Sequence, residues 1–478
     1  MANEYKKVAS FRDVKESAAY LKAENIPLPL EMDLAGKKEL ALGSAWEWKG
    51  RKIGNRFAIL PMEGWDCERD GNPSERTRRR WLRFAGSGAK LLAGTEAASV
   101  LHEGRSNPYQ LMIADHTVEN LAKIVKEMRS HHKSLYGKDE DMLIGLQLTH
   151  SGRFAHPDDS HTRAPRTAYA HPLLDKKFSC GKEHVVSDKD VKTIIDAFIH
   201  AGVLAQKAGF DFVDVKQAHG YLGHEFLTAY DRPGPYGGSF ENRTRFFREI
   251  VEGIQKEAPG LEIAPRLSIF DIFPFMKGTD GVGHPMEWKG HYPYAFGGDG
   301  SGMNMDPNLT EVVKFVEMMH SYGIDLVCGT IGSPYYNVHM QRPAYYAVCD
   351  GYAMPEDPLY NVYRHFHAVK MLKKFCPYLK VIGAGATCLQ EFLPHAAEYA
   401  VAHNEMDAVG LGRMVLSYPE FAADTLAGKE LDKRRICRTF GECTNAPRNG
   451  MVSGCYILDS FYKNTPEAEK LKELRKKS

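Results

Sequence analysis

A cluster of ionisable side chains follows one short, β-rich run of the sequence. Residues 211–215 have the composition of a buried strand, and Lys216, His219 and Tyr221 come directly after it. Ammonium, imidazole and phenol groups exchange protons or bind a carbonyl oxygen, so their close spacing indicates acid–base or carbonyl chemistry. An apolar pattern resumes at residues 225–227, which places the three groups in the turn after the strand.

Two later turns offer open backbone together with a cation. Gly383 and Gly385 belong to the motif IGAGAT, and Gly412 and Arg413 belong to GLGRM. Glycine lets a ligand approach the backbone closely, and a guanidinium pairs well with a phosphate. Glycine also ends strands for steric reasons, so each glycine alone is weak evidence. Together the two turns predict a site for a phosphorylated cofactor.

The elements that must position these residues alternate regularly between strand and helix. Strand-like runs occur at residues 57–62, 89–93, 142–148, 211–215, 262–267, 325–328, 380–382 and 407–411. Helical patterns lie between them at residues 75–84, 118–131, 188–207, 242–257, 309–322, 359–375, 390–403 and 419–426. Eight such units predict an α/β fold, a parallel (β/α)8 TIM barrel. An open doubly wound sheet is the alternative, but no strand leads into a GxGxxG turn.

Active sites of such barrels lie at the carboxyl ends of the strands, and further polar groups occur at those positions. They could bind the edge of a flat polar ring such as an isoalloxazine: Pro61, Met62, Glu63, Gly94, Gln147 and Arg266. Arg266 could place positive charge beside such a ring, and Gln147 could bond its pyrimidine edge. Ordinary hydrogen bonds at the barrel mouth are the alternative for each residue taken alone.

Two long segments rich in aromatic residues follow the fifth and sixth strands. Residues 270–308 and 332–358 both fall on the catalytic side of the barrel. They are expected to form either a lid over a substrate or simple packing on the barrel surface. Residues 38–55 have the pattern of a hairpin that closes the barrel bottom.

The composition excludes several other classes of protein. The chain has 62 Lys and Arg against 61 Asp and Glu. It therefore lacks the excess of positive charge that would indicate binding to nucleic acid or to an anionic membrane. The N-terminus lacks the apolar core of a signal peptide and no membrane-length apolar run occurs, so a cytoplasmic protein is expected. Nine scattered Cys indicate reduced thiols rather than disulfides. The oligomeric state stays open, and a homo-oligomer is one option.

The ordered motifs resemble one known family. NRFAILPM, GLQLTHSGR, HGYLGHEFL, YGGSFENRTRF, IGAGA and GLGR, between residues 55 and 413, are similar to those of the old yellow enzyme family of FMN-dependent ene-reductases. The resemblance implies noncovalent FMN, reduction by NADH or NADPH, and reoxidation by an α,β-unsaturated carbonyl compound. It places the FMN contacts at Pro61, Met62, Glu63, Gly94, Gln147, Arg266, Gly385, Gly412 and Arg413. His219 falls on a residue that binds the substrate carbonyl, and Tyr221 falls on the proton donor.

The sequence departs from that family pattern at two positions. Lys216 stands where many members have the first His of the carbonyl-binding pair. It could polarise a carbonyl or thioester, or it could pair with a carboxylate such as Glu63 or Asp214. Glu63 stands where members often carry Thr or Cys near the flavin, so the reduction potential is expected to differ. The alkene itself is left open.

The C-terminal segment tests a second resemblance, to longer relatives that carry a 4Fe-4S cluster after the barrel. Cys443 and Cys455 keep the final spacing of that cluster motif, but Ile436 and Thr439 stand at the first two ligand positions. Four thiolates are usually required, which argues against a cluster and against any other metal site. We expect an FMN-binding barrel over residues 1–430, including an N-terminal extension and hairpin to about residue 55. Residues 431–478 are expected to be a tail that packs on the barrel, without appended nucleotide-binding domains.

These patterns together predict an NAD(P)H-dependent ene-reductase. Hydride would reach the β-carbon of the substrate from FMN N5, and Tyr221 would protonate the α-carbon. The expected partner is a small unsaturated carbonyl compound. A flavin dehydrogenase or demethylase, or an electron-transfer subunit serving a partner flavoprotein, is the alternative.

Overall fold

The largest sheet of the protein is a closed ring of parallel strands. The computed structural model describes residues 5–300 and 307–477, and the strand order of this sheet is β7–β6–β5–β4–β3–β13–β12–β11–β8. The backbone N–H of Gln217, just after β6, donates to the carbonyl of Arg266 in β8 at 2.8 Å and closes the ring. The predicted (β/α)8 barrel is therefore confirmed.

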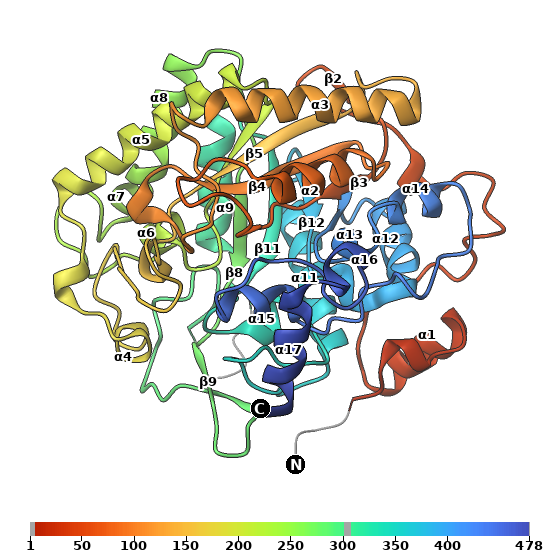
Figure 1. Cartoon of the computed structure of the whole chain (residues 1–478). Helices are drawn as coiled ribbons and strands as arrows, with labels where there is room; N and C mark the ends of the chain where they lie inside the picture. Colours follow the sequence, from red (N-terminus) through yellow and green to blue (C-terminus); the bar gives the residue numbers. More distant parts are fainter. Residues whose placement is uncertain (1–4, 301–306, 478) are drawn as a thin grey trace.

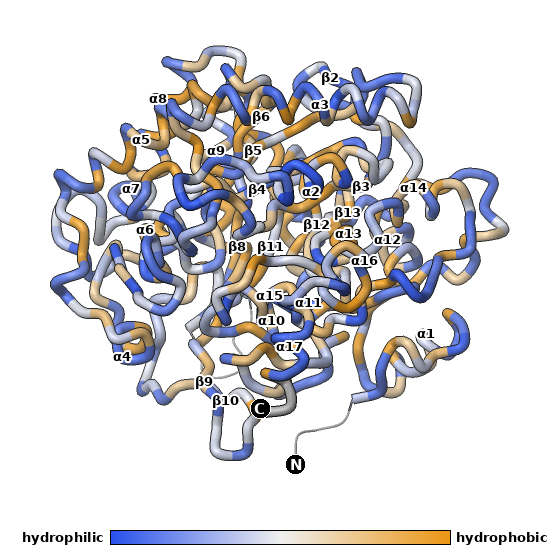
Figure 2. The backbone as a smooth tube through the Cα atoms, in the orientation of Figure 1, coloured by the Kyte–Doolittle hydropathy of each residue, from blue (hydrophilic) through white to orange (hydrophobic). Residues whose placement is uncertain are grey.

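The barrel strands are short and buried on both faces, as is typical of parallel sheets. In chain order they are β3 (Phe57–Ile59), β4 (Leu91–Ser99), β5 (Leu143–Thr149), β6 (Phe212–Val215), β7 (Glu262–Ile263), β8 (Arg266–Phe270), β11 (Leu326–Ile331), β12 (Lys380–Gly383) and β13 (Ala408–Leu411). β7 and β8 are two parts of the fifth predicted strand, which is interrupted at Ala264 and Pro265. Proline has no N–H to continue the ladder. Figure 2 shows these strands as the apolar centre of the molecule.

Helices form the outer layer of the barrel (Figure 1). Eight of them follow the strands at the predicted places: α2 (Glu75–Ala85), α3 (Val118–Tyr136), α5 (Asp188–Lys207), α8 (Arg245–Glu257), α9 (Thr310–Ser321), α11 (Pro358–Phe375), α12 (Leu393–Ala402) and α14 (Phe421–Leu426). Local sequence fixes their starts. The side chain of Ser187, for example, accepts from the backbone N–H of Asp190 and caps α5.

The other helices lie in the connections and in the two terminal segments. They are η1 (Val8–Ser10), α1 (Val14–Ala23), η2 (Ala41–Gly43), η3 (His102–Gly104), η4 (Gly152–Phe154), α4 (Leu174–Phe178), η5 (Lys182–His184), α6 (Leu222–Leu227), α7 (Phe240–Arg243), α10 (Val338–Gln341), η6 (Ala386–Phe392), α13 (Met414–Ser417), α15 (Glu442–Arg448), α16 (Ser460–Lys463) and α17 (Pro466–Lys477). In residues 5–300 and 307–477, no helix combines the length and apolarity needed to cross a membrane.

A β-hairpin closes one end of the barrel, as predicted. Strands β1 (Trp46–Trp48) and β2 (Arg51–Ile53) pair antiparallel. The ring of Trp48 meets Phe212 of β6 edge-on at 5.4 Å between centroids, and its N–H donates to Asp325 at 2.8 Å. The indole therefore fills the barrel bottom while its polar atom is satisfied.

The two long aromatic segments lie after β8 and β11 and extend the opposite end of the barrel. The first contains an antiparallel hairpin of β9 (Phe275–Lys277) and β10 (Gly283–Pro285), and its residues 301–306 lie outside the described part. The second contains α10. Phe154, which follows β5, stacks on Tyr335 of the second segment at 3.9 Å and 8°. These segments therefore build walls above the carboxyl ends of the strands.

The C-terminal tail packs against α2. Arg79 of α2 donates two hydrogen bonds of 3.0 Å to Asp459, and Arg76 pairs with Glu467 at 3.3 Å. Figure 1 shows α15 and α17 in front of the barrel strands. Charged contacts therefore join the tail to α2, one of the outer helices of the barrel.

Candidate active site

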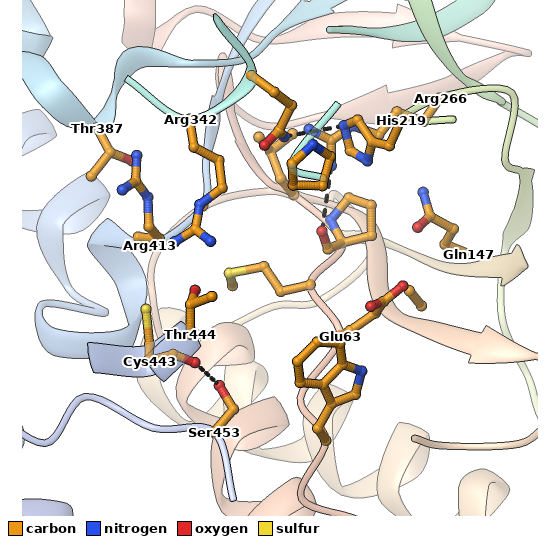
Figure 3. A pocket seen from close by; sticks show the side chains of 18 of the residues that line it. Glu63, Gln147, His219, Arg266, Arg342, Thr387, Arg413, Cys443, Thr444 and Ser453 are labelled. Atoms are coloured by element: carbon orange, nitrogen blue, oxygen red, sulfur yellow. Dashed lines mark hydrogen bonds between the residues drawn. The ribbon is translucent and has the colours of Figure 1, made fainter. Parts of the chain in front are cut away.

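One cavity at the carboxyl ends of the barrel strands brings together most of the residues singled out from the sequence. Those that line it are Pro61, Met62, Glu63, Gln147, Lys216, His219, Tyr221, Arg266, Gly385, Gly412 and Arg413. They come from the ends of six different strands, and only the closed barrel makes them neighbours. Figure 3 shows how the side chains converge on this cavity.

Gly94 and Gly383 are the two predicted residues that do not line the cavity. A side chain at Gly94 would place its Cβ 2.9 Å from Cβ of Pro61, at a backbone φ of +136°. A Cβ at Gly383 would lie 2.9 Å from the terminal methyl of Met406. Gly94 thus allows close packing against the cavity residue Pro61, and Gly383 allows close packing against Met406. Direct contact with a cofactor stays a prediction for them.

A hydrogen-bonded carboxylate occupies the β3 side of the cavity. Glu63 Oε1 accepts a 2.5 Å bond from the Tyr221 hydroxyl and lies 3.6 Å from Lys216 Nζ. The Tyr335 hydroxyl lies 2.8 Å from that of Tyr221. Ser106 donates to Glu63 Oε2 at 3.0 Å. Glu63 therefore holds the phenol and the ammonium on one of its oxygens.

This arrangement shows which of the two candidate carboxylates pairs with Lys216. Its Nζ pairs with Glu63, and in the described part of the chain no ion pair joins it to Asp214. Nζ also lies 3.5 Å from the ring centroid of Tyr221. Burial lowers the pKa of Lys216 to about 8, against the opposing effect of Glu63. Burial and the Glu63 carboxylate hold the pKa of Tyr221 well above its usual range.

His219 sits in a strained turn that its neighbours fix in place. Its φ is +69°, in the left-handed region, and Gly220 follows at +75°. The hydroxyl of Ser268 accepts from the His219 N–H at 3.1 Å, and Ser333 donates to the His219 carbonyl at 2.8 Å. Burial, Arg266 and Lys216 lower the pKa of His219 well below its usual range. The imidazole is therefore neutral at neutral pH and directed at the cavity.

A second carboxylate orders the β5 side. Asp214 accepts from the Gln147 amide at 2.5 Å and from the backbone N–H of Arg266 at 2.6 Å. Burial raises the pKa of Asp214 to about 6. The Arg266 side chain donates to the Pro61 carbonyl at 3.4 Å, whereas its buried Nε has no partner among the described residues. Such an orphaned donor fits a ligand that brings its own acceptor.

The far end of the cavity carries two arginine side chains and suits an anion. Arg342, Arg413 and Thr387 lie together at one side of Figure 3, and Gly385 and Gly412 line the same cavity. Arg413 donates to a backbone carbonyl at 2.9 Å, and no carboxylate in the described part pairs with Arg342. Burial and the nearby Arg413 lower the pKa of Arg342 to about 10. A phosphate would relieve this repulsion.

Several residues of the site were not found from the sequence. The tail supplies Cys443, Thr444, Arg448 and Ser453 to the cavity wall, although sequence analysis treated it only as packing. Arg448 differs from Arg342 because it forms an ion pair with Asp350. Among residues 5–300 and 307–477, no three His, Cys, Asp or Glu side chains are grouped closely enough to hold a metal ion.

The cavity combines polar groups that suit the edge of a flat ring, arginines that suit a phosphate, and an acid–base cluster. This combination is typical of a flavin-binding oxidoreductase site in a barrel. Comparison with known proteins agrees, because residues 47–290 match the model of the NADH:flavin oxidoreductase / NADH oxidase family. The chain belongs to this family, and the resemblance to old yellow enzymes is confirmed.

Individual relatives cover different shares of the chain. NADPH dehydrogenase of Bacillus pumilus is 33% identical over 222 residues, which are 46% of this chain and 61% of that protein. NADPH dehydrogenase of Bacillus cytotoxicus is 26% identical over 403 residues, or 82% of this chain and 95% of that protein.

Two solved structures share the fold. The complex of 2-naphthoyl-CoA reductase with 2-naphthoyl-CoA has a TM-score of 0.63 at 18% identity, covering 90% of this chain and 58% of that one. Histamine dehydrogenase from Rhizobium sp. 4-9 has a TM-score of 0.63 at 20% identity, covering 88% and 53%. The present chain thus spans a little more than half of each.

Proposed function

We propose that this chain is an FMN-dependent oxidoreductase that uses NADPH or NADH to reduce the carbon–carbon double bond of an α,β-unsaturated carbonyl compound. The observation that carries the proposal is the convergence of Tyr221, His219 and Lys216 on the cavity that also contains the anion corner. A proton donor and a carbonyl-binding group beside a cofactor site are what this reaction needs.

The residues of the cavity fit FMN at both of its ends. Arg342 and Arg413, with the backbone of Gly385 and Gly412, would hold the phosphate. Gln147 and the unpartnered Nε of Arg266 would bind the pyrimidine edge of the ring. When bound, FMN would supply the hydride chemistry of the reaction. The cavity residues then only have to bind the substrate and supply a proton.

The chain's own residues have separate tasks in this reaction. Neutral His219 donates one N–H to the substrate carbonyl oxygen, where negative charge develops as the β-carbon is reduced. The Lys216 ammonium adds positive charge nearby. Tyr221 then gives its hydroxyl proton to the α-carbon. Because these side chains are buried, water is kept from the reacting carbons.

The test is an anaerobic titration in two stages. NADPH or NADH is added to the FMN-loaded protein, and a panel of enones, enoates and enoyl-CoA thioesters is then added while the flavin spectrum is recorded. The proposal predicts bleaching by the nicotinamide and recovery of colour with one class of alkene. A flavin that bleaches but recovers only with an artificial electron acceptor would contradict it.

One observation favours a second function, oxidation of a cationic amine. The Glu63 carboxylate and the rings of Tyr221 and Tyr335 face the cavity and could bind an ammonium group. One of the structures with the same fold is named histamine dehydrogenase. The Lys216 ammonium already neutralises Glu63, which makes this the weaker candidate. Flavin bleaching by amines in the absence of nicotinamide would favour it.

A further inference from the structure

We propose that Glu63 is a positioning residue that returns a proton to Tyr221 and that the Lys216 ammonium is the source of this proton. The three side chains would then act as one proton relay. This inference rests on the proposed function, because it assumes that Tyr221 protonates the substrate.

The relay is built around a single oxygen atom. Glu63 Oε1 accepts from the Tyr221 hydroxyl at 2.5 Å and lies 3.6 Å from Lys216 Nζ. The ammonium also lies 3.5 Å from the centroid of the Tyr221 ring. The carboxylate is therefore a bridge between the phenol and the ammonium. The Nζ–Oε1 distance is within ion-pair range but slightly beyond a hydrogen bond, so Lys216 must move toward Glu63 during the transfer.

The other oxygen of Glu63 is held from the opposite side. Ser106 donates to Oε2 at 3.0 Å, and the indole N–H of Trp65 donates to the Ser106 hydroxyl at 2.9 Å. Trp65 itself lines the cavity. This support keeps Oε1 directed at Tyr221, and a carboxylate held in this way orients the phenol as well as exchanging its proton.

A relay is needed because the phenol is buried. Tyr221 is 2% exposed, and burial together with Glu63 raises its pKa. A phenolate left beside an ionised carboxylate would be strongly disfavoured. Return of a proton to the phenol oxygen as its own proton leaves avoids that state. Because Glu63 is the carboxylate in contact, it is the group placed to do this.

The proton steps balance without any electron transfer. The Tyr221 O–H bond breaks as the C–H bond forms at the α-carbon of the substrate. The Lys216 ammonium gives a proton to the Glu63 carboxylate, and the carboxylate passes that proton on to the phenol oxygen, so Glu63 ends ionised as it began. The neutral amine of Lys216 regains a proton from solvent after the product leaves. One solvent proton is consumed per turnover, as reduction of a double bond by NADPH requires.

The charge environment of Lys216 sets the pH range of the relay. Glu63 and Asp214 favour its charged form, while burial and Arg266 disfavour it, and its pKa is lowered to about 8. His219 is neutral and the Tyr221 phenol is un-ionised over this range. Lys216 is charged below about pH 8 and neutral above it. The proton step is therefore expected to slow as pH rises through that value.

Tyr335 offers a matched control, because it contacts the same phenol from the other side. Its hydroxyl lies 2.8 Å from that of Tyr221, and in the described part of the chain no hydrogen bond joins it to Lys216 or Glu63. If Glu63 is the route, Tyr335→Phe keeps the relay intact. If Tyr335 is the route instead, Tyr335→Phe should slow the proton step and Glu63→Gln should not.

The first readout is the reoxidation of the reduced, FMN-loaded protein by an enone that reacts with the wild type, measured from pH 6 to 10. We expect Glu63→Gln to slow this step roughly 10- to 100-fold at neutral pH and to flatten its pH dependence near 8. Tyr335→Phe should keep the wild-type pH dependence near 8, because it leaves the Glu63–Lys216 pair in place. Reaction with dioxygen, which needs no proton at carbon, should be unchanged in both.

The second readout does not depend on activity. 3-Fluorotyrosine is incorporated at position 221, and its 19F resonance is titrated in the protein without FMN. We expect Glu63→Gln to shift this titration to lower pH, because the neighbouring negative charge is removed. Lys216→Met is a second variant for the case that Glu63→Gln does not fold, and it should abolish the pH dependence near 8.

The outcomes separate this inference from the proposed function. A Glu63→Gln protein with the wild-type rate and pH profile, or an unshifted 19F titration, overturns the relay while ene-reduction stands. A Tyr335→Phe protein that is slowed more than Glu63→Gln assigns the route to Tyr335 instead. A wild-type protein that no enone reoxidises overturns the proposed function, and the relay with it.

Discussion

The two ends of the cavity differ in whether their charged side chains are paired with one another. At one end, Glu63, Lys216 and Tyr221 satisfy one another through hydrogen bonds and an ion pair. At the other end, Arg342 and Arg413 converge, and in the described part of the chain no carboxylate pairs with Arg342. The first end is organised before any ligand arrives, which suits proton transfer. The second end is cationic, which suits retention of a phosphorylated cofactor.

The largest effect is expected at the organised end. Tyr221→Phe removes the proton donor but leaves the ring, so alkene reduction should slow by about 10²–10⁴-fold. Reduction of the flavin by NADPH needs no proton from this residue and should be nearly unchanged. Stopped-flow measurement of the two half-reactions checks this. Equal loss in both would mean that Tyr221 supports the site structurally.

Substitution of Arg342, at the cationic end of the cavity, is expected to have two smaller effects of opposite sign, one on FMN affinity and one on stability. Arg342→Met should weaken FMN binding roughly 10- to 100-fold, because a charge-assisted hydrogen bond contributes about 1.5–3 kcal/mol. The same variant should raise the melting temperature of the FMN-free protein, since it removes a cation that has no counter-charge. Flavin fluorescence titration and thermal unfolding measure the two effects.

Arg448→Met is the matched control for that experiment. Arg448 lines the same cavity but already pairs with Asp350. Its substitution should leave FMN affinity within about 3-fold of wild type. If both variants lose FMN equally, the distinction between paired and unpaired arginines has no functional meaning.

Alanine substitutions of Gly412 and Gly385 separate an effect on FMN binding from an effect on the stability of the FMN-free protein. A Cβ at Gly412 would meet no protein atom within 4 Å, so Gly412→Ala should leave the FMN-free protein stable and weaken FMN binding by about 10-fold or less. A Cβ at Gly385 would lie 2.4 Å from the His365 ring at a φ of +81°. Gly385→Ala should therefore destabilise the FMN-free protein itself. Equal stability of the two variants would contradict this.

The smallest effect is expected behind His219. Ser333→Ala removes the 2.8 Å bond to the His219 carbonyl and should cost about 1 kcal/mol of unfolding free energy. Chemical denaturation measures this cost. Binding of a phenol to the loaded enzyme should weaken only a few-fold, because Ser268 still holds the other side of the turn. An unchanged denaturation midpoint would mean that the strained turn does not depend on this bond.

The barrel and most of its strand-end residues could be predicted because parallel strands carry a clear apolar pattern and end at one face. The strand at β4 was predicted too short, ending at residue 93, because Gly94 reads as a strand end. The chain instead bulges there and continues to Ser99. Fold and position together thus identified Glu63, Lys216 and Tyr221.

Residues on irregular segments could not be predicted in the same way. Arg342 lies in a long loop, and Cys443, Thr444 and Ser453 lie in the tail, where no periodicity indicates direction. The one available sequence signal for Arg342 was that a cationic residue occurs within the aromatic segment at residues 332–358. The Glu63–Lys216 pair was considered from the sequence, but Asp214 was an equal alternative that only the geometry decides against.

The most direct test of the central claim is the position of deuterium in the product. The loaded enzyme is run with NADPH and a prochiral enone in D2O, and the saturated product is examined by NMR. The account predicts one deuterium at the α-carbon with a single stereochemistry, formed far more slowly by Tyr221→Phe. An α-carbon labelled at the same rate and on the same face in Tyr221→Phe would contradict it.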